Sequence, residues 1–203
     1  MVGQMMRPLD GGRRLLPSLA YTSRRDGYKD GYNICPAQTT VQSSMASKLV
    51  RRMYAWRGYD TDSIGYQEED PNRVTLAAWR AGEVVATLTL GRDSPAGLLA
   101  DALYSSELDS LRHPDRVFCE VSRLAVAPDY SVPGLLTTLF HAALRYGKEV
   151  FAASDAVMEV NPRHARYYQS RMGFKQIGAL RQCERVAAPA VLLHQTLGGI
   201  IIA

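Results

Sequence analysis

The amino-acid sequence predicts a single α/β (α+β) domain in which helices flank a mixed central sheet. The chain has 203 residues, the size of one ordinary domain. Hydrophobic residues make up 46% of it and charged residues 22%, which is enough apolar material for a core. Segments of helical periodicity alternate with β-rich segments in the middle of the chain, and hairpin-like pairs of β-rich segments lie toward both ends.

The N-terminal part contains an extension, a short strand and an amphipathic helix. Residues 1–31 are polar and rich in Gly and Arg, which predicts a flexible or loosely docked extension to a domain over residues 32–203. A first strand is expected at Tyr32–Pro36. Thr39 and Thr40 are candidate caps, and from about Thr40 apolar residues recur at helical spacing. They are Met45, Leu49, Met53 and Trp56.

The middle of the chain predicts a hairpin, a helical segment and a central strand. Arg73–Arg92 consists of two β-rich runs around the turn Arg80–Glu83. Gly97–Leu111 carries regularly spaced leucines, which indicate one or two short helices. Val117–Val126 is a β-rich run that stops at Pro128.

The C-terminal part alternates helices and strands. Pro133 is expected to open a helix with a broad apolar face. Pro162 begins a second helix, which should end at Met172, before Gly173. Three strands are expected here: Ala156–Val160, Lys175–Arg181 and Val191–Thr196.

Several classes of protein are excluded by what the sequence lacks. It has no run of about 18 apolar residues for a transmembrane helix, and the basic N-terminal segment has no long apolar stretch for a secretory signal. The cysteines Cys35, Cys119 and Cys183 are far apart, and the histidines share no ligand spacing. We therefore expect no disulfide framework, no metal site and a cytoplasmic location.

Positive charge is concentrated at the N-terminal end. Residues 1–57 contain ten Lys or Arg against three Asp, whereas the rest of the chain contains 14 against 17 acidic residues. Lys48, Arg51 and Arg52 share one surface patch of the first helix. The asymmetry indicates either an acidic partner or a solvated basic surface. No base-reading pattern favours nucleic acid.

The strand around Glu120 is the segment most suggestive of chemistry. A charged residue in an apolar central strand is costly to bury, so Glu120 and Arg123 indicate a buried ion pair or a functional site. Strict alternation predicts one face with Glu120, Ser122 and Leu124, and the other with Val121, Arg123 and Ala125. Cys119 then points away from Glu120 and has no evident His partner, so it is expected to be a core thiol.

At this strand the sequence resembles a known family. Glu120-Val-Ser122-Arg123-Leu-Ala-Val126 with Pro128 is similar to a strand signature of the acyl-homoserine-lactone autoinducer synthases. It resembles still more the bacterial long-chain N-acyl amino acid synthases that make N-acyltyrosines. Both families have the GCN5-related N-acetyltransferase (GNAT) fold, with splayed central strands. Leu49–Tyr59 and the segment from Val160 to Phe174 resemble the first and fourth helices of that fold.

The resemblance implies transfer of a long fatty acyl group from a thioester to the α-amino group of an amino acid, with tyrosine as the acceptor. Coenzyme-A users place a Gly-rich turn around the pyrophosphate. Here the equivalent stretch, Ser131–Leu136, keeps only Gly134, because Pro133 lacks an amide donor and Leu136 is bulky. The single phosphodiester of a phosphopantetheine arm needs fewer donors. An acidic acyl carrier protein that contacts Lys48, Arg51 and Arg52 is therefore the expected donor.

The expected mechanism is direct attack of the amine on the thioester. The carbonyl would lie where the central strands splay after Ser122. Backbone N–H groups near Leu124, Ala125 and Val126 would then act as oxyanion donors. Glu120 is the candidate base. From the resemblance, Arg123 orients either Glu120 or the acceptor.

The helix after Pro162 supplies the remaining candidates. Tyr168 is either the general acid or a core residue, and Tyr167 and His164 are candidates for the wall of the site. Leu98, Leu99, Leu103, Leu139 and Phe140 line an acyl channel or belong to the core. Three alternative functions stay open: an acyl-homoserine-lactone synthase, a coenzyme-A-dependent acetyltransferase and a non-catalytic module that binds acyl carrier protein.

Overall fold

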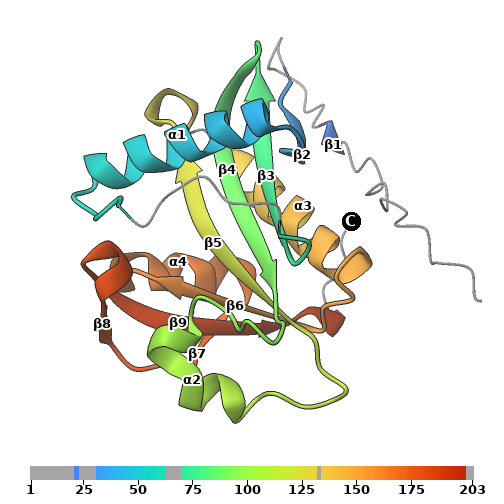
Figure 1. The fold of residues 1–203 in the computed structure, drawn as a ribbon, viewed down its shortest axis with the longest axis vertical. Coiled ribbons are helices and arrows are strands. Elements are labelled where there is room, and N and C mark those ends of the chain that lie inside the picture. Colours follow the sequence, from blue (N-terminus) through green and yellow to red (C-terminus); the bar gives the residue numbers. More distant parts are fainter. Residues whose placement is uncertain (1–20, 23–30, 63–69, 132–133, 200–203) are drawn as a thin grey trace, which may run out of the picture.

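A computed structural model describes residues 21–22, 31–62, 70–131 and 134–199. Its sheet has the strand order β1-β2-β3-β4-β5-β6-β9-β7, and β8 pairs with the start of β9 (Figure 1). The strands are β1 (Tyr21–Thr22), β2 (Asn33–Pro36), β3 (Arg73–Arg80), β4 (Glu83–Arg92), β5 (Phe118–Val126), β6 (Asp155–Val160), β7 (Lys175–Gln176), β8 (Arg181–Cys183) and β9 (Ala188–Thr196). The α-helices are α1 (Thr40–Trp56), α2 (Asp101–Asp109), α3 (Leu135–Glu149) and α4 (Pro162–Met172).

The predicted fold class is confirmed. The sheet is mixed, because β5 and β6 are parallel whereas the other neighbouring strands are antiparallel. Most of the proposed extension, residues 1–31, lies outside the described residues, and so does Pro133. Within that extension, Tyr21–Thr22 pairs with β2.

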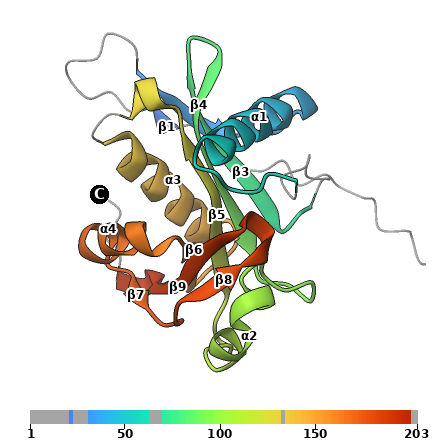
Figure 2. The same cartoon turned by 90° about the vertical axis from the view of Figure 1, so that its left-hand side faces the viewer.

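Helices cover both faces of the sheet, α1 and α2 on one face and α3 and α4 on the other (Figure 2). The side chains of β5 show this division. Cys119 and Val121 belong to the cluster that α3 and α4 cover. Phe118 packs in the α2 cluster and Ala125 in the α1 cluster. The side chains of β5 therefore belong to two separate apolar layers, one on each face of the sheet.

The predicted helix boundaries follow local capping chemistry. Thr39 caps α1 through a capping box with Gln42. Asn161 caps α4, Pro162 occupies its first turn, and Gly173 ends it with a left-handed φ of 75°. These helix ends confirm the sequence prediction.

The predicted apolar stripe of α1 is wrong at its C-terminal end. The helix buries Ala46, Leu49, Val50 and Met53, but Trp56 is 69% exposed. In Figure 1 the last turn of α1 extends beyond the strands that the helix covers.

The strand predicted at Lys175–Arg181 is also corrected, because β7 ends at Gln176 and β8 begins at Arg181. Between them the chain passes closely over α2. A Cβ atom on Gly178 would lie 2.6 Å from the Tyr104 ring and 2.7 Å from Leu192. The close approach requires glycine and interrupts the regular strand.

Strands β5 and β6 are held together at one end and separate at the other. Their ladder joins Phe118–Glu120 to Asp155–Val157 and goes no further among the described residues. At the paired end, the buried Asp155 carboxylate accepts hydrogen bonds from Arg116 Nε at 2.9 Å and from Ser154 at 2.7 Å, and contacts His194 at 2.7 Å. This cluster ties β5, β6 and β9 together at the end opposite to the opening.

Replacing Asp155 by asparagine is expected to lower the free energy of unfolding by about 1.5–3 kcal/mol, because it removes the charge of a buried carboxylate that accepts hydrogen bonds from the half-buried Arg116 guanidinium. Chemical denaturation measures the change, with the exposed Asp115→Asn as the matched control. Equal small losses in the two variants would contradict a structural role for Asp155. Burial raises the pKa of Asp155, but the hydrogen bonds from Arg116 and Ser154 outweigh it and lower the pKa to about 2. The stabilisation is therefore present above the ordinary value of 3.8 and is lost as the pH falls through about 2.

Candidate active site

A cavity of about 210 Å³ lies where β5 and β6 separate. Its wall comes from β5, β6, the end of α1, the start of α4 and the segment between β8 and β9. The residues of the two strands that line it are Glu120, Val121, Ser122, Arg123, Leu124, Met158, Glu159 and Val160. The cavity thus opens at the parting of the strands that the sequence analysis expected, although the ladder ends at Glu120, two residues earlier.

The structure brings together six of the predicted site residues and leaves the others apart. Glu120, Ser122, Arg123, Leu124, His164 and Tyr168 all line the cavity. Ala125, Val126 and Tyr167 do not line it; Ala125 packs against α1, and Tyr167 is 39% exposed. Lys48, Arg51 and Arg52 lie on the exposed face of α1.

A β-bulge at Arg123 corrects the predicted alternation of β5. Thr89 pairs with Ser122 and Thr87 with Ala125, so one residue of β4 faces both Arg123 and Leu124. Arg123 adopts a left-handed φ of 50°. Beyond Ser122 the alternation therefore shifts by one residue, and Ala125 lies on the face of Ser122 rather than opposite it.

The bulge is stabilised from the neighbouring strand. The buried Thr87 hydroxyl donates to the Arg123 carbonyl at 3.2 Å. A left-handed residue with a side chain is strained, and such strain is characteristic of functional sites. Its effect here is to direct the Arg123 side chain to the cavity.

The Glu120 side chain is almost completely buried and accepts hydrogen bonds from a backbone turn before α2. The residue is 2% exposed. Its carboxylate accepts the Leu99 N–H at 2.7 Å and the Ala100 N–H at 3.0 Å, one on each oxygen. Each oxygen keeps a second lone pair, so these bonds leave the carboxylate able to take a proton from the cavity that it lines.

Burial raises the pKa of Glu120 to about 7. The Leu99 N–H opposes this rise, the charge of Glu159 adds to it, and the positive charge of Arg185 opposes it. Near neutral pH the group therefore exchanges a proton readily, which suits a general base. Among the described residues, no hydrogen bond or ion pair joins Arg123 to Glu120, whose two oxygens accept from Leu99 and Ala100.

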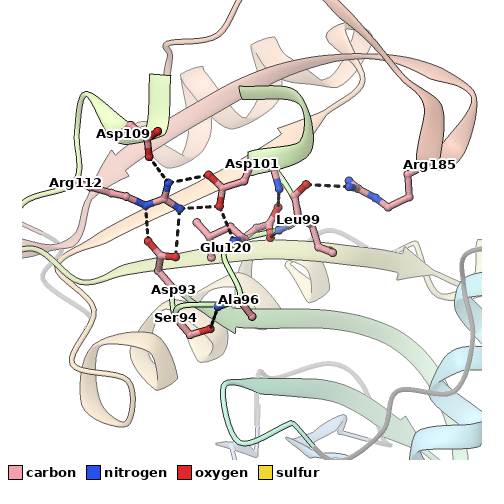
Figure 3. Close-up of polar contacts among 11 residues, drawn as sticks. Asp93, Ser94, Ala96, Leu99, Asp101, Asp109, Arg112, Glu120 and Arg185 are labelled. Atoms are coloured by element: carbon pink, nitrogen blue, oxygen red, sulfur yellow. Dashed lines mark hydrogen bonds and ion pairs between the residues drawn. The ribbon is translucent and has the colours of Figure 1, made fainter. Parts of the chain in front are cut away.

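The turn bound by Glu120 is anchored by further polar contacts (Figure 3). Asp101 accepts the Leu98 N–H at 2.7 Å and pairs with Arg112 at 2.7 Å. Arg112 also pairs with Asp93 at 2.8 Å and with Asp109 at 2.7 Å. The turn that donates to the Glu120 carboxylate is therefore held in place by ion pairs between residues in and near α2.

The Arg123 guanidinium has no hydrogen-bond or ion-pair partner in the part of the chain that the structure describes. The side chain is partly buried at the cavity. Burial lowers its pKa, and the positive charges of Arg73 and Arg185 lower it further, whereas Tyr54 opposes the shift. An anion bound here would satisfy a guanidinium that the described residues leave without a counter-charge.

The α4 side of the cavity carries two titratable groups. Tyr168 is 7% exposed and lines the cavity, and burial raises the pKa of its hydroxyl. Burial and the nearby Arg57 and Arg163 lower the pKa of His164. At neutral pH the tyrosine keeps its proton and the histidine is uncharged.

Cys119 is fully buried in the core, and burial raises the pKa of its thiol to about 12. The prediction that this residue is a core thiol rather than a nucleophile is confirmed.

Several cavity residues escaped the sequence analysis. Glu159 on β6 is a charged residue in an apolar strand, the signal that identified Glu120, and that signal could have found it. Arg57 and Arg185 stand in polar segments distant from β5 along the chain, and no pattern marks them. Of the proposed channel residues, Leu99 lines the cavity, whereas Leu139 and Phe140 belong to the core.

The described residues contain no group of three or more His, Cys, Asp or Glu residues placed to hold a metal ion. None of their helices has both the length and the apolar character needed to cross a membrane.

Comparisons with known proteins agree on the kind of fold. The family model described as N-acyl amino acid synthase FeeM matches residues 45–196. The solved structure of FeeM, an N-acyl amino acid synthase from uncultured soil microbes, is 26% identical, with a TM-score of 0.78 over 84% of this chain and 93% of that one.

More distant structures share the fold alone. An acyl-CoA N-acyltransferase from Pseudomonas aeruginosa is 17% identical, with a TM-score of 0.55 over 82% of this chain and 99% of that one. The GNAT domain of S. lividans PAT is 18% identical, with a TM-score of 0.58 over 87% and 96%. A search of curated proteins found no match.

Proposed function

The chain belongs to the FeeM family of N-acyl amino acid synthases, and we propose that it transfers a long-chain fatty acyl group from an acyl carrier protein to the α-amino group of an amino acid. Tyrosine is the proposed acceptor. The observation that carries this proposal is a nearly sealed carboxylate, Glu120, at a cavity between parted strands. The reaction is a direct transfer that needs no covalent acyl-enzyme.

Glu120 is the proposed base. The α-ammonium group of an amino acid must lose a proton before its nitrogen can attack. A carboxylate whose pKa is raised to about 7 can take that proton, directly or through a water, near neutral pH. The nitrogen then forms a bond to the thioester carbon, and a tetrahedral oxyanion develops.

Backbone amides of β5 beyond Glu120 are proposed to stabilise this oxyanion. On the side of β6, the stretch from Ser122 has no ladder partner among the described strands. Donors that already point at a developing charge stabilise it more than mobile donors do. When the C–S bond breaks, the departing thiolate needs a proton. Tyr168, which lines the cavity with a raised pKa, is the proposed source. The nitrogen of the tetrahedral intermediate carries one proton more than the amide keeps, and that proton passes to the tyrosinate, which returns Tyr168 to its neutral form.

Arg123 is the proposed partner of the acceptor's α-carboxylate. The guanidinium reaches the cavity without a counter-charge from the described chain, and its surroundings carry excess positive charge. A planar carboxylate pairs well with a guanidinium through two parallel hydrogen bonds. Of the two roles expected for Arg123, this proposal takes the orientation of the acceptor.

The carrier protein is the proposed donor on electrostatic and steric grounds. Gly134 precedes α3, and Leu135 and Leu136 form its first turn. Pro133 has no amide hydrogen, so the segment offers few donors to the pyrophosphate of coenzyme A. The phosphopantetheine arm carries one phosphodiester, and its carrier is acidic. Lys48, Arg51 and Arg52 are exposed on α1 and provide a complementary surface.

A product screen tests the proposed function. The protein is incubated with acyl carrier protein, or with coenzyme A, loaded with fatty acids of several lengths, and with each of the twenty amino acids. Mass spectrometry identifies the products. N-acyl amino acid from the carrier-bound donor is the expected result. Transfer from coenzyme A alone would overturn the proposed donor, and the absence of product with every acceptor would overturn the proposed reaction.

Reversing the charge of Lys48, Arg51 and Arg52 to glutamate is expected to raise KM for acyl carrier protein about tenfold and to weaken its salt dependence. Exposed charge pairs each contribute about 0.2–1 kcal/mol, and salt screens them. The control reverses three exposed cations on α3 and α4, which cover the opposite side of the sheet: Lys148, Arg166 and Arg171. Equal KM changes in both triple variants would mean that α1 does not face the donor.

A further inference from the structure

Glu159 is a second carboxylate in the cavity and has one oxygen unused. Its side chain is 8% exposed. Oε2 pairs with Arg185 at 3.0 Å, whereas Oε1 is buried and has no hydrogen-bond partner among the described residues. A buried carboxylate oxygen without a donor is costly. Because Glu159 also lines the cavity, a bound ligand can supply the missing donor.

Glu159 lies on the same face of the sheet as Glu120. Glu120 pairs with Val157 in the ladder, and Glu159 follows Val157 by two residues, so their side chains share a face. The two carboxylates are close enough for the charge of Glu159 to raise the pKa of Glu120. A ligand that meets Glu159 is therefore next to the proposed base.

Arg185 holds Glu159 in place. It donates to Glu159 Oε2 at 3.0 Å. It also donates to the Leu99 carbonyl at 3.1 Å, and Leu99 belongs to the turn that Glu120 binds (Figure 3). The Cys183 thiol lies beside the same carboxylate; burial, the charge of Glu159 and a side-chain hydrogen bond with that carboxylate raise the pKa of the thiol. A thiol is a weak donor, so Oε1 has no strong donor among the described residues.

We propose that Glu159 binds the protonated α-amino group of the acceptor and presents it to Glu120. This inference rests on the proposed function, since it assigns a subsite for the amino-acid acceptor. An α-amino acid is a zwitterion and needs an anionic and a cationic contact. Glu159 on β6 and Arg123 on β5 supply these from the two strands that border the cavity. The amino group loses its proton to Glu120 before its nitrogen attacks.

Binding of L-tyrosine and of its deaminated analogue, 3-(4-hydroxyphenyl)propionate, to the full chain tests this subsite without an acyl donor. Calorimetry should show that the wild type binds tyrosine about tenfold more tightly than the analogue, because hydrogen bonds to charged groups are strong. Glu159→Gln should bind the two ligands equally. Glu159→Asp, with its carboxylate one methylene further back, should show an intermediate preference.

Glu107→Gln is the matched control, because Glu107 pairs with Arg181 at 2.6 Å and does not line the cavity. It should keep the tenfold preference. A preference retained in Glu159→Gln, or no preference in the wild type, would overturn the subsite. Acyl transfer is measured separately. Loss of the preference in Glu159→Gln, with no transfer by the wild type, would support the subsite and contradict the proposed reaction.

Discussion

Glu120→Gln is expected to lower kcat/KM for acyl transfer about 10²–10⁴-fold, the usual contribution of a general base. The amide cannot accept the proton of the attacking amine. In the wild type, kcat/KM should rise with pH through about 7, as the Glu120 carboxylate becomes ionised. The residual activity of the variant should not show this rise. Steady-state rates across the pH range measure both effects.

The loss of rate alone would not prove a chemical role, because Glu120 also binds the Leu99 and Ala100 amides. Asp101→Asn is the matched control. Asp101 accepts the Leu98 N–H of the same turn but does not line the cavity. It should lower stability and some activity while keeping the rise of kcat/KM near pH 7. If Glu120→Gln also kept that rise, Glu120 would be a structural anchor and the proton would go elsewhere.

The raised pKa of Glu120 has a consequence for stability as well. The folded protein holds this proton up to about pH 7, whereas the unfolded chain releases it near 4.5. The contribution is therefore fully present below pH 4.5 and is lost as the pH rises through about 7. Glu120→Gln should lack this loss, which equilibrium unfolding at several pH values can measure.

Local patterns were sufficient to predict most of the fold. Thr39, Pro162 and Gly173 mark helix ends through capping and local backbone preferences. The order of helices and strands likewise follows from periodicity. The prediction was wrong where tertiary contacts decide. The break after β7 depends on the close approach of Gly178 to Tyr104, which is distant in sequence.

The same distinction holds for the site: local sequence patterns marked some of its residues, and contacts between segments distant in sequence determine the rest. An acidic residue in an apolar strand marked Glu120, and the same rule would have marked Glu159. The bulge at Arg123 is different. One residue of β4 faces two residues of β5 at the bulge, and this unequal pairing is visible only when the two strands lie side by side. Alternation along one strand therefore placed Arg123 on the wrong face, although its residue type had identified it as a candidate.

Arg123→Ala is the second variant with a large expected effect: about a 10²-fold rise in KM for the amino-acid acceptor. Hydrogen bonds to charged groups contribute about 1.5–3 kcal/mol, and each 1.4 kcal/mol is a factor of ten. Alanine keeps the Cβ atom, so the left-handed backbone at φ 50° is equally strained in both proteins. The change in KM then reports the lost guanidinium rather than a relaxed bulge.

The carboxylate contact is isolated by comparing L-tyrosine with tyramine, which has the same amine and side chain but no carboxylate. The wild type should use tyrosine far better than tyramine, and Arg123→Ala should use the two with similar KM. Arg123→Lys should recover only part of the difference, since an ammonium cannot form the paired hydrogen bonds of a guanidinium. A preference for tyrosine that survives in Arg123→Ala would show that another cavity cation, Arg57 or Arg185, holds the carboxylate. The unpaired charge at the bulge would then serve the oxyanion or the donor instead.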